Sequence, residues 1–405
     1  MHLRTHRRGL VAAGVALLLG CAALAPATAG ASGQSPSKSE QAAEITKIVE
    51  QAISSIHLKS VIVKVTQGDK VIIRKAWGES MTDVPATPKM RFRNGAVAYQ
   101  YLGNLLMQLV DEKKLSLDDT IDEWFPDLPN ADQVTVKMVT NQTSGYPDYQ
   151  FDEGWRNSFS NDPFQIFTVK QRLDYAFSKA PFFAPGTNWS YAHTNFLILG
   201  EILAKVGGKP LDVLIKEKIL DPLGLQGTTA TDTSEIPSPV LHTFSSERTG
   251  LYEEATFWNT SWGVPPGANQ TTTIDDLATT AAALGSGKFL TKKSAEAMNG
   301  PNLLGFGEPL EACAPGCFTQ TEFYNFGLGV VRQGDWLLQT PLLSGIGATD
   351  AYLPSEKISI AVAITLLPDA FTADFSYPPN PSKTLFVEIA NALGHAPPTP
   401  PASSG

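Results

Sequence analysis

The sequence predicts an α+β fold, in which an antiparallel sheet is flanked by helices and a mainly helical subdomain is inserted between its strands. Runs of β-branched residues lie near both ends of the 405-residue chain. Between them, apolar residues recur at helical spacing in several segments. We therefore expect strands from the two ends of the chain to pair with one another, so that the sheet is completed only when the last strands are added.

The first elements follow from local patterns. Residues 42–56 have apolar side chains at helical spacing and predict an amphipathic helix. The runs 61–65 and 71–76 are β-branched and are joined by Gln67-Gly68-Asp69, which is typical of a hairpin turn. A leucine- and methionine-rich helix is expected over residues 97–114.

Helices and strands of the second half follow in the same way. Ser382 is expected to cap a last helix that ends at Leu393, because serine accepts hydrogen bonds from the first turn of a helix. Gly334-Asp335 predicts a turn between two strands. The remaining expected helices are 196–206 and 211–220, and the expected strands are 326–331, 336–343 and 358–367.

The N-terminus is typical of an export signal. Basic residues within the first eight positions precede an apolar run over residues 10–19, which is too short to cross a bilayer. Residues 18–21 (LLGC) resemble a bacterial lipobox, in which Cys21 becomes acylated after cleavage. Residues 27–29 (ATA) offer an ordinary signal-peptidase site as the alternative. We favour the lipobox, which predicts a membrane lipoprotein in the cell envelope rather than a secreted protein.

Composition divides the chain into four parts. Residues 1–20 are the predicted signal peptide, and residues 21–41 form a flexible tether rich in serine and glycine. Residues 42–394 form one folded domain. Residues 395–405 are rich in proline and serine and predict a disordered tail.

The charge and the cysteine content exclude some classes of protein. The chain carries 31 basic and 40 acidic side chains, a formal net charge of −9. Nucleic-acid binding needs a basic surface, so no nucleic acid is expected as a partner. Three cysteines are too few for a disulfide scaffold. Cys313 and Cys317 are predicted to form a disulfide in an exported protein, and neither a metal site nor a cofactor is expected.

Five short phrases occur in a characteristic order. They are residues 90–95 (MRFRNG), 114–119 (KLSLDD), 141–149 (NQTSGYPDY), 185–191 (PGTNWSY) and 221–225 (DPLGL). Together they resemble the serine β-lactamase and penicillin-binding-protein superfamily, in particular its class-C-like esterases and D-alanyl-D-alanine carboxypeptidases. The resemblance covers residues 42–394 and implies a β-lactamase/transpeptidase-like fold.

The resemblance also implies where the catalytic pair should lie. The superfamily performs acyl transfer with a Ser-x-x-Lys pair at the start of a helix. The matching positions here read Ala96-Val97-Ala98-Tyr99, with Ala96 at the place of the serine and Tyr99 at the place of the lysine. The one Ser-x-x-Lys match, Ser35 with Lys38, lies in the predicted tether. We therefore expect the serine nucleophile to be missing.

Two further motifs depart from the superfamily pattern. The Tyr-x-Asn motif reads Tyr191-Ala192-His193, so that the tyrosine is retained and histidine replaces asparagine. The third motif should lie near Ser344 and Gly345 on a strand that usually carries lysine or histidine. Residues 338–347 contain neither.

These departures leave two hypotheses. The first, which we favour from the sequence, is a catalytically inactive envelope protein that is not an enzyme. It would bind a peptidoglycan peptide, a β-lactam-like or ester ligand, or a protein partner. The second is an active hydrolase of the esterase, β-lactamase or D-Ala-D-Ala carboxypeptidase type, whose rewired site uses Tyr99, Tyr191 and His193, since histidine beside tyrosines is suited to acid–base work.

Overall fold

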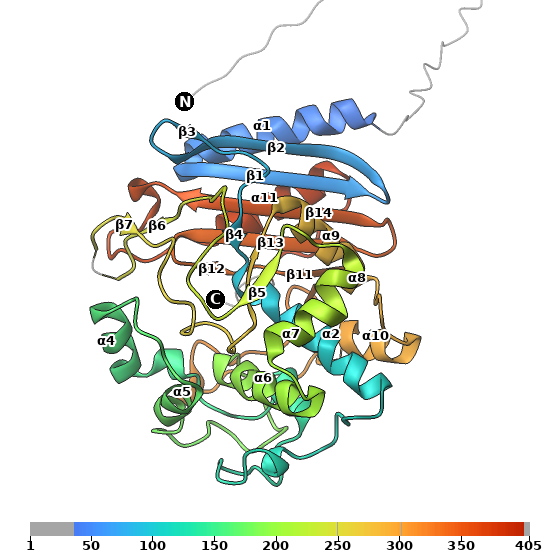
Figure 1. Cartoon of the computed structure of the whole chain (residues 1–405). Coiled ribbons are helices and arrows are strands. Elements are labelled where there is room, and N and C mark those ends of the chain that lie inside the picture. The colour runs from blue at the N-terminus through green and yellow to red at the C-terminus, as the bar shows by residue number, and fades with distance from the viewer. Residues whose placement is uncertain (1–35, 249, 301, 401–405) are drawn as a thin grey trace, which may run out of the picture. The chain divides into compact units, whose positions relative to one another are not determined.

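The computed structural model describes residues 36–248, 250–300 and 302–400, and Figure 1 shows a sheet with helices around it. The main sheet has nine strands and is antiparallel throughout. In spatial order they are β3 (Val84–Pro85), β2 (Lys70–Met81), β1 (Leu58–Gln67), β14 (Ile358–Leu366), β13 (Ile346–Leu353), β11 (Trp336–Gln339), β10 (Val331–Gln333) and β9 (Asn325–Phe326), with β12 (Leu342–Leu343) paired to β13.

Strands from the two ends of the chain meet in the middle of this sheet. β1 pairs with β14 in an antiparallel register that sets Val61 opposite Ile364. Both strands are apolar and almost entirely buried, which favours a central position in the sheet. The expectation is confirmed that strands from the two ends of the chain pair in one antiparallel sheet.

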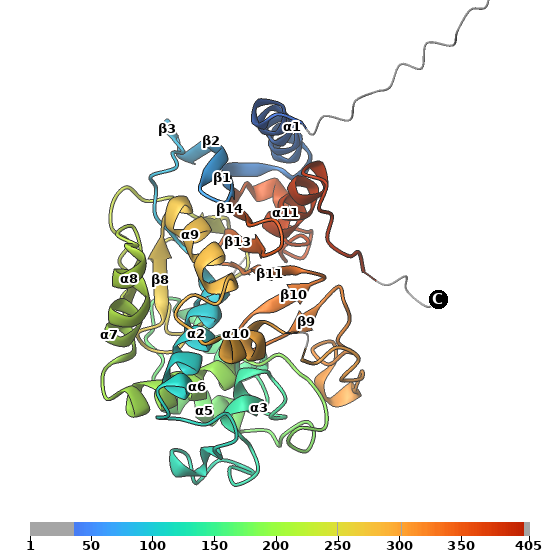
Figure 2. The same cartoon turned by 90° about the vertical axis from the view of Figure 1, so that its right-hand side faces the viewer.

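Helices cover both faces of the sheet. α1 and α11 pack together on one face, and α9 packs on the other, against β1, β13 and β14 (Figure 2). The helices are α1 (Lys38–Ile56), α2 (Ala98–Asp111), α3 (Val136–Thr140), α4 (Glu153–Asn161), α5 (Val169–Ala176), α6 (His193–Gly207), α7 (Leu211–Ile215), α8 (Asp221–Leu223), α9 (Ile274–Gly285), α10 (Lys292–Asn299) and α11 (Pro381–Ala392).

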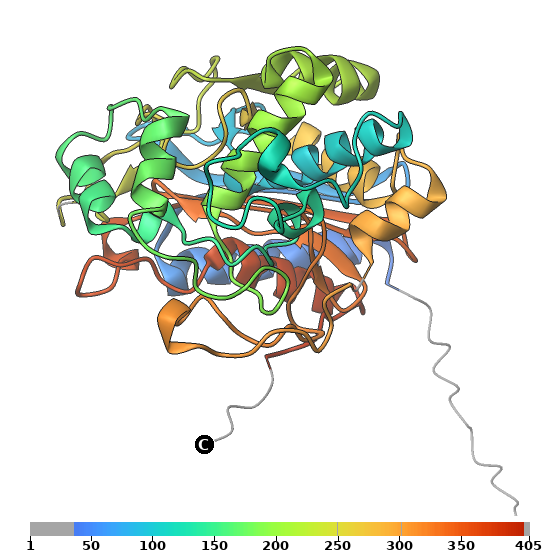
Figure 3. The same ribbon diagram turned by 90° about the horizontal axis from the view of Figure 1, so that it is seen from below.

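The predicted helical subdomain lies between the first and the last strands of the sheet along the chain. Seen from below in Figure 3, its helices, teal to light green, lie in front of the sheet. Two small sheets belong to the same stretch of chain and connect it to the main sheet. They are β4 (Phe92–Arg93), β8 (Asn269–Thr272) and β5 (Thr229–Thr231), and β6 (Phe244–Ser245) with β7 (Glu253–Glu254).

The structure corrects several boundaries. α1 begins at Lys38 with Ser37 as its cap, so the folded part starts before residue 42. The cap of α11 is Asn380, whose side chain accepts from the Ser382 and Lys383 N–H groups, and not Ser382. The expected helix 211–220 is helical throughout but changes to a π-helical turn after Ile215.

The start of the predicted tail is also corrected. The His395 carbonyl accepts a hydrogen bond from the Trp336 indole, and the Pro398 carbonyl accepts one from Gln333. Residues 395–398 are therefore held against β10 and β11. The predicted signal peptide and Cys21 lie outside the described residues.

The sequence analysis missed several strands, of which β13 is the longest. β13 (IGATDAYL) has small and polar residues where alternating β-branched residues would have been the signal. It is buried along its whole length because it lies between β11 and β14 and beneath helices. Within the described part of the chain, no helix has both the length and the apolarity needed to cross a membrane.

Candidate functional site

The turn that leads into α2 carries the first pair of predicted site residues. β4 is followed by a short 3-10 helix, Gly95–Val97, and then by α2, so that Ala96 precedes the helix and Tyr99 lies in its first turn. A Cβ placed on Gly95 would lie 2.6 Å from Leu343 Cδ2. The turn that carries Ala96 therefore lies against Leu343, which directly precedes the third-motif residues Ser344 and Gly345.

The residues of the second motif lie at the N-terminus of α6. Tyr191 precedes this helix, and His193 is its first residue. The Tyr191 and His193 ring centroids are 5.2 Å apart, and that of Tyr99 lies 6.3 Å from Tyr191 and 6.4 Å from His193. Tyr99 also stacks on Phe196 at 3.7 Å. The fold brings the three predicted residues into one cluster.

A carboxylate that the sequence analysis did not single out completes this cluster. His193 Nδ1 lies 2.7 Å from Asp148 Oδ2, and the Asp148 side chain is 3% exposed while that of His193 is 22% exposed. Because an ionised carboxylate only accepts hydrogen bonds, a neutral imidazole paired with it carries its proton on Nδ1 and its lone pair on Nε2. Asp148 lies within the quoted phrase 141–149. The signal that could have identified it is the need of a catalytic histidine for a carboxylate partner.

Buried polar side chains hold the phrase 141–149 against α6. Asn195 Nδ2 donates to Gln142 Oε1, and Ser144 Oγ donates to Asn195 Oδ1. Thr194 Oγ1 donates to the Pro147 carbonyl and accepts from the Tyr149 N–H. These bonds tie the segment before Asp148 to the first turn of α6, and they thereby fix the histidine and its carboxylate relative to one another.

The tyrosines of the cluster are neutral hydrogen-bond donors. Burial raises the pKa of Tyr99 and of Tyr191 well above the ordinary value. The Tyr99 hydroxyl makes no hydrogen bond of normal geometry within the described part of the chain. The Tyr149 ring also lies near His193, with 6.3 Å between the ring centroids, but its hydroxyl donates to the Trp262 carbonyl. The phenols of Tyr99 and Tyr191 can donate to an oxygen that becomes negative during a reaction.

The third motif forms a tight turn between β12 and β13. Tyr377 Oη accepts a hydrogen bond from the Gly345 N–H, and Ser344 adopts a left-handed backbone conformation with φ 45°. Burial raises the pKa of Glu247 to about 7, although Tyr377 and the Ser344 backbone N–H hydrogen-bond to its carboxyl group. Leu343 precedes the turn and packs against a second group of buried residues, mostly aromatic, to which Tyr149 belongs. This group is called the aromatic cluster below.

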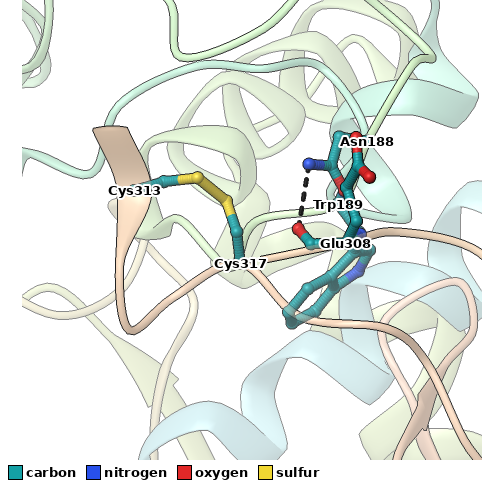
Figure 4. Close-up of a disulfide and its surroundings, with 5 residues drawn as sticks. All are labelled: Asn188, Trp189, Glu308, Cys313 and Cys317. Carbon is teal, nitrogen blue, oxygen red and sulfur yellow. Dashed lines mark hydrogen bonds between the residues drawn. A yellow bond between two sulfur atoms is a disulfide. The ribbon is translucent and has the colours of Figure 1, made fainter. Parts of the chain in front are cut away.

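Cys313 and Cys317 form a disulfide, as the sequence predicts (Figure 4). Among the residues that the structure describes, no group of three histidine, cysteine or acidic side chains is arranged to hold a metal ion. The assignment of Ala96 and Tyr99 to the places of the serine and lysine rests on the resemblance and stays a prediction.

Comparison with known proteins identifies a family and several relatives. Residues 45–376 match the family described as Beta-lactamase. The chain is 30% identical over 169 residues to a D-aminopeptidase of Brucella anthropi, a match that covers 40% of this chain and 31% of the relative. It is 30% identical over 138 residues to penicillin-binding protein 4* of Bacillus subtilis, with 33% of this chain and 29% of the relative covered. The chain thus spans about a third of the length of these curated relatives.

Solved structures show the same fold. A D-amino acid amidase from Ochrobactrum anthropi SV3, complexed with L-phenylalanine amide, superposes with a TM-score of 0.73 at 20% identity, over 88% of this chain and 99% of that chain. A D-stereospecific amidohydrolase from Streptomyces sp. gives 0.66 at 23% identity, over 80% and 94%. The predicted fold class is confirmed.

These relatives correct one expectation. The sequence analysis favoured a protein that is not an enzyme, because Ala96 and Tyr99 take the places of the catalytic pair. Two of the proteins that this chain resembles are named as enzymes, a D-aminopeptidase and a D-amino acid amidase. That expectation is therefore wrong. The tertiary structure also shows a histidine–carboxylate pair that the sequence analysis did not consider.

Proposed function

Because this chain belongs to the β-lactamase family, we propose that it is a hydrolase that cleaves amide or ester bonds with His193 as its general base. The observation that carries the proposal is the 2.7 Å contact between His193 Nδ1 and the buried Asp148 carboxylate, beside the Tyr191 ring. A histidine oriented by a carboxylate is the arrangement by which hydrolases activate a nucleophile.

The proposed reaction uses water as the nucleophile. His193 Nε2 accepts a proton from a water molecule while the water oxygen attacks the carbonyl carbon of the substrate. The carbonyl oxygen becomes negative, and the Tyr191 hydroxyl donates a hydrogen bond to it. The protonated imidazole then gives its proton to the leaving amine or alcohol as the bond to the carbonyl carbon breaks. Asp148 stays ionised and stabilises the imidazolium that forms between the two steps.

The N-terminus of α6 acts on both charges of this step: it stabilises the negative carbonyl oxygen, and it opposes the positive charge on His193, which Asp148 stabilises. His193 is the first residue of a 15-residue helix, and Ala192 offers no side-chain oxygen to cap its first turn. The positive end of a helix stabilises a nearby negative charge. This effect adds to the hydrogen bond from Tyr191, because both act on the carbonyl oxygen only after attack has begun.

The proposed substrates are amides or esters of D-amino acids without a free carboxylate next to the scissile bond. Support for the D-amino acid comes from the names of the relatives. The third motif supports a substrate without a free carboxylate, because residues 338–347 contain no basic side chain and Leu343 packs on the aromatic cluster. A substrate carboxylate there would find no cation on residues 338–347 to pair with.

We also propose that the protein is exported and held at the membrane by a lipid on Cys21, as the sequence predicts. Labelling of cells with an alkyne-bearing fatty acid tests this. Label is expected on the wild type and not on Cys21→Ser, and label that persists on the variant would contradict the proposal.

The hydrolase proposal is tested with the purified mature protein. We expect release of ammonia from D-alanine amide or D-phenylalanine amide, or of p-nitrophenol from esters, and slower reaction with the L-amides. His193→Gln should lower turnover by about 10⁴-fold. The matched control is His242→Gln, since His242 also contacts a carboxylate, Glu254, but lies outside the cluster. Absence of turnover from the whole panel, or full activity of His193→Gln, would refute the proposal.

Intact mass spectrometry during turnover tests the nucleophile. With water as the nucleophile, no acyl adduct accumulates on the protein with a fluorescent penicillin or with an ester. A penicilloyl or acyl adduct mapped to a serine would show that a serine attacks the substrate, and the water mechanism would then be discarded.

A further inference from the structure

A loop closed by the disulfide lies against the segment that leads into the site. The disulfide loop (residues 305–320) contains Cys313 and Cys317. Its base is closed by two backbone hydrogen bonds, from the Gly305 N–H to the Gln320 carbonyl and from the Gln320 N–H to the Phe306 carbonyl. The neighbouring segment is residues 188–193, whose last three residues are the second motif. Figure 4 shows the two side by side.

Asn188 joins the segment to the loop with two hydrogen bonds. Its Nδ2 donates to the Glu308 carbonyl at 3.1 Å, and its Oδ1 accepts from the Glu308 N–H at 2.9 Å. The same oxygen accepts from the Trp189 N–H at 2.8 Å. Asn188 is 2% exposed, so these bonds are shielded from water. The Asn188 side chain thus pairs with the loop backbone much as a neighbouring strand would.

Aromatic packing makes a second connection. The Trp189 ring lies 4.8 Å from that of Phe318, which directly follows Cys317, and 6.0 Å from that of Phe326. Phe326 in turn contacts Tyr191, with 6.1 Å between the ring centroids. The rings therefore form a continuous path from the end of the disulfide to the tyrosine of the site.

The backbone of the loop approaches side chains of the segment closely at two glycines. A Cβ on Gly307 would lie 3.2 Å from Asn188 Oδ1 and 3.4 Å from Trp189 Cβ. A Cβ on Gly316, between the two cysteines, would lie 3.5 Å from the Ser190 Oγ. Both the base and the disulfide end of the loop thus touch residues that immediately precede Tyr191.

We propose that the disulfide loop holds Tyr191 and His193 in their reactive positions, with Asn188 as the positioning residue, so that the site is fully active only when Cys313 and Cys317 are oxidised. This rests on the hydrolase function proposed above. A dithiol reductant would give two electrons and two protons to the disulfide, which breaks into two thiols while the dithiol is oxidised to its own disulfide. The loop would then lose its covalent closure next to Ser190.

Turnover is sensitive to such a change because proton transfer needs the base within hydrogen-bond distance of the attacking water. A displacement of about 1 Å can lower a rate by about 100-fold. The effect should appear mainly in kcat. The loop acts on Tyr191 and His193, and we expect both residues to act in the chemical step, after the substrate has bound.

The experiment compares the oxidised and the reduced wild type with a Cys313→Ser/Cys317→Ser double variant. We expect dithiothreitol to lower kcat of the wild type by about tenfold with little change in KM. The double variant should have the low kcat already and should not respond to dithiothreitol. Asn188→Asp should lower kcat similarly, because its carboxylate cannot donate to the Glu308 carbonyl. Asn302→Asp, which also loses a bond to a backbone carbonyl, is the matched control and should retain full activity.

A second readout does not depend on activity. The ring-proton resonances of His193, assigned by their absence in His193→Gln, should move on reduction, while those of His242 stay in place. If the wild type hydrolyses none of the substrates but the His193 signals move, the loop does position the site and the hydrolase function fails. If those signals stay in place, or if reduction leaves kcat within about twofold of the oxidised value, the proposed role of the loop is wrong. Far-UV circular dichroism of each sample shows whether the fold is kept.

Discussion

Two regions of this protein place a histidine against a carboxylate at nearly the same distance. At the N-terminus of α6, His193 Nδ1 lies 2.7 Å from Asp148 Oδ2. Beside the β6–β7 hairpin, His242 Nδ1 lies 2.6 Å from Glu254 Oε1. The Asp148 side chain is 3% exposed and that of Glu254 is 39% exposed. The distance alone therefore does not distinguish a candidate site from a histidine–carboxylate contact at the surface.

The surroundings of the two histidines make the difference. His193 lies among the rings of three tyrosines, Tyr99, Tyr149 and Tyr191. The ring contact described for His242 is to Phe257, which carries no hydroxyl group and is itself largely exposed. A buried carboxylate with nearby hydroxyl donors can both orient the base and stabilise an oxyanion. In an exposed pair, water screens the attraction between histidine and carboxylate, so the pair contributes little free energy.

The largest effect is expected from removal of the site histidine. His193→Gln should lower kcat/KM for the best amide or ester substrate by about 10⁴-fold, because the general base is lost. His242→Gln should change it by less than about twofold, since exposed pairs contribute little. Steady-state kinetics of the two variants measure the contrast. Equal losses in both variants would mean that the comparison between the two regions is mistaken.

Replacement of the carboxylates should give the next largest effect. Asp148→Asn keeps the shape of the side chain but no longer fixes the histidine tautomer or stabilises the imidazolium, and we expect kcat to fall by about 10³-fold. Glu254→Gln is the parallel change in the other region and should leave kcat as it is. An Asp148→Asn variant with normal kcat would show that Asp148 has only a structural role.

The tyrosine hydroxyl should contribute less. Tyr191→Phe retains the ring packing and removes the donor to the oxyanion, for which we expect a loss in kcat of about 100-fold. Tyr252→Phe is the control, because it removes a phenol that donates to the Leu366 carbonyl outside the cluster. A mere rise in KM for Tyr191→Phe would place its hydroxyl in substrate binding and not in transition-state stabilisation.

Another buried carboxyl group, that of Asp350, sharpens the comparison through stability. Asp350 on β13 accepts hydrogen bonds from the Gln339 N–H and the Gln100 side chain, both neutral, and burial raises its pKa to about 8. The unfolded chain loses this proton near pH 4, whereas the fold keeps it. Stability should therefore fall between about pH 4 and pH 8, by up to roughly 1.4 kcal/mol for each pH unit.

Asp350→Asn should remove this part of the pH dependence. Denaturant unfolding at pH 5 and pH 8 measures the pH dependence of the free energy of unfolding. At pH 8 the variant should be more stable relative to the wild type than it is at pH 5. A wild type whose loss of stability between the two pH values equals that of the variant would contradict the assignment. The effect on kcat should be small, because Asp350 lies beneath α2 and not at the histidine.

The sequence was informative where local pattern and structure coincide. Tyr99, Tyr191 and His193 could be grouped from their places in recognisable phrases, and the structure shows their rings together. Asp148 stood in one of those phrases without a role, because its partner is 45 residues away. β13 was missed since its burial comes from its neighbours and not from its own apolar residues.

By itself the sequence determined the fold class, the antiparallel pairing of the two ends of the chain and the family, because each depends on residue types in a fixed order. The tertiary structure alone decided that His193 has a buried carboxylate while His242 has an exposed one, and that the disulfide loop lies against Asn188. The physical reason is that hydrogen bonds and burial are set by distances between segments far apart in the chain, and such distances leave no periodic signal in the sequence.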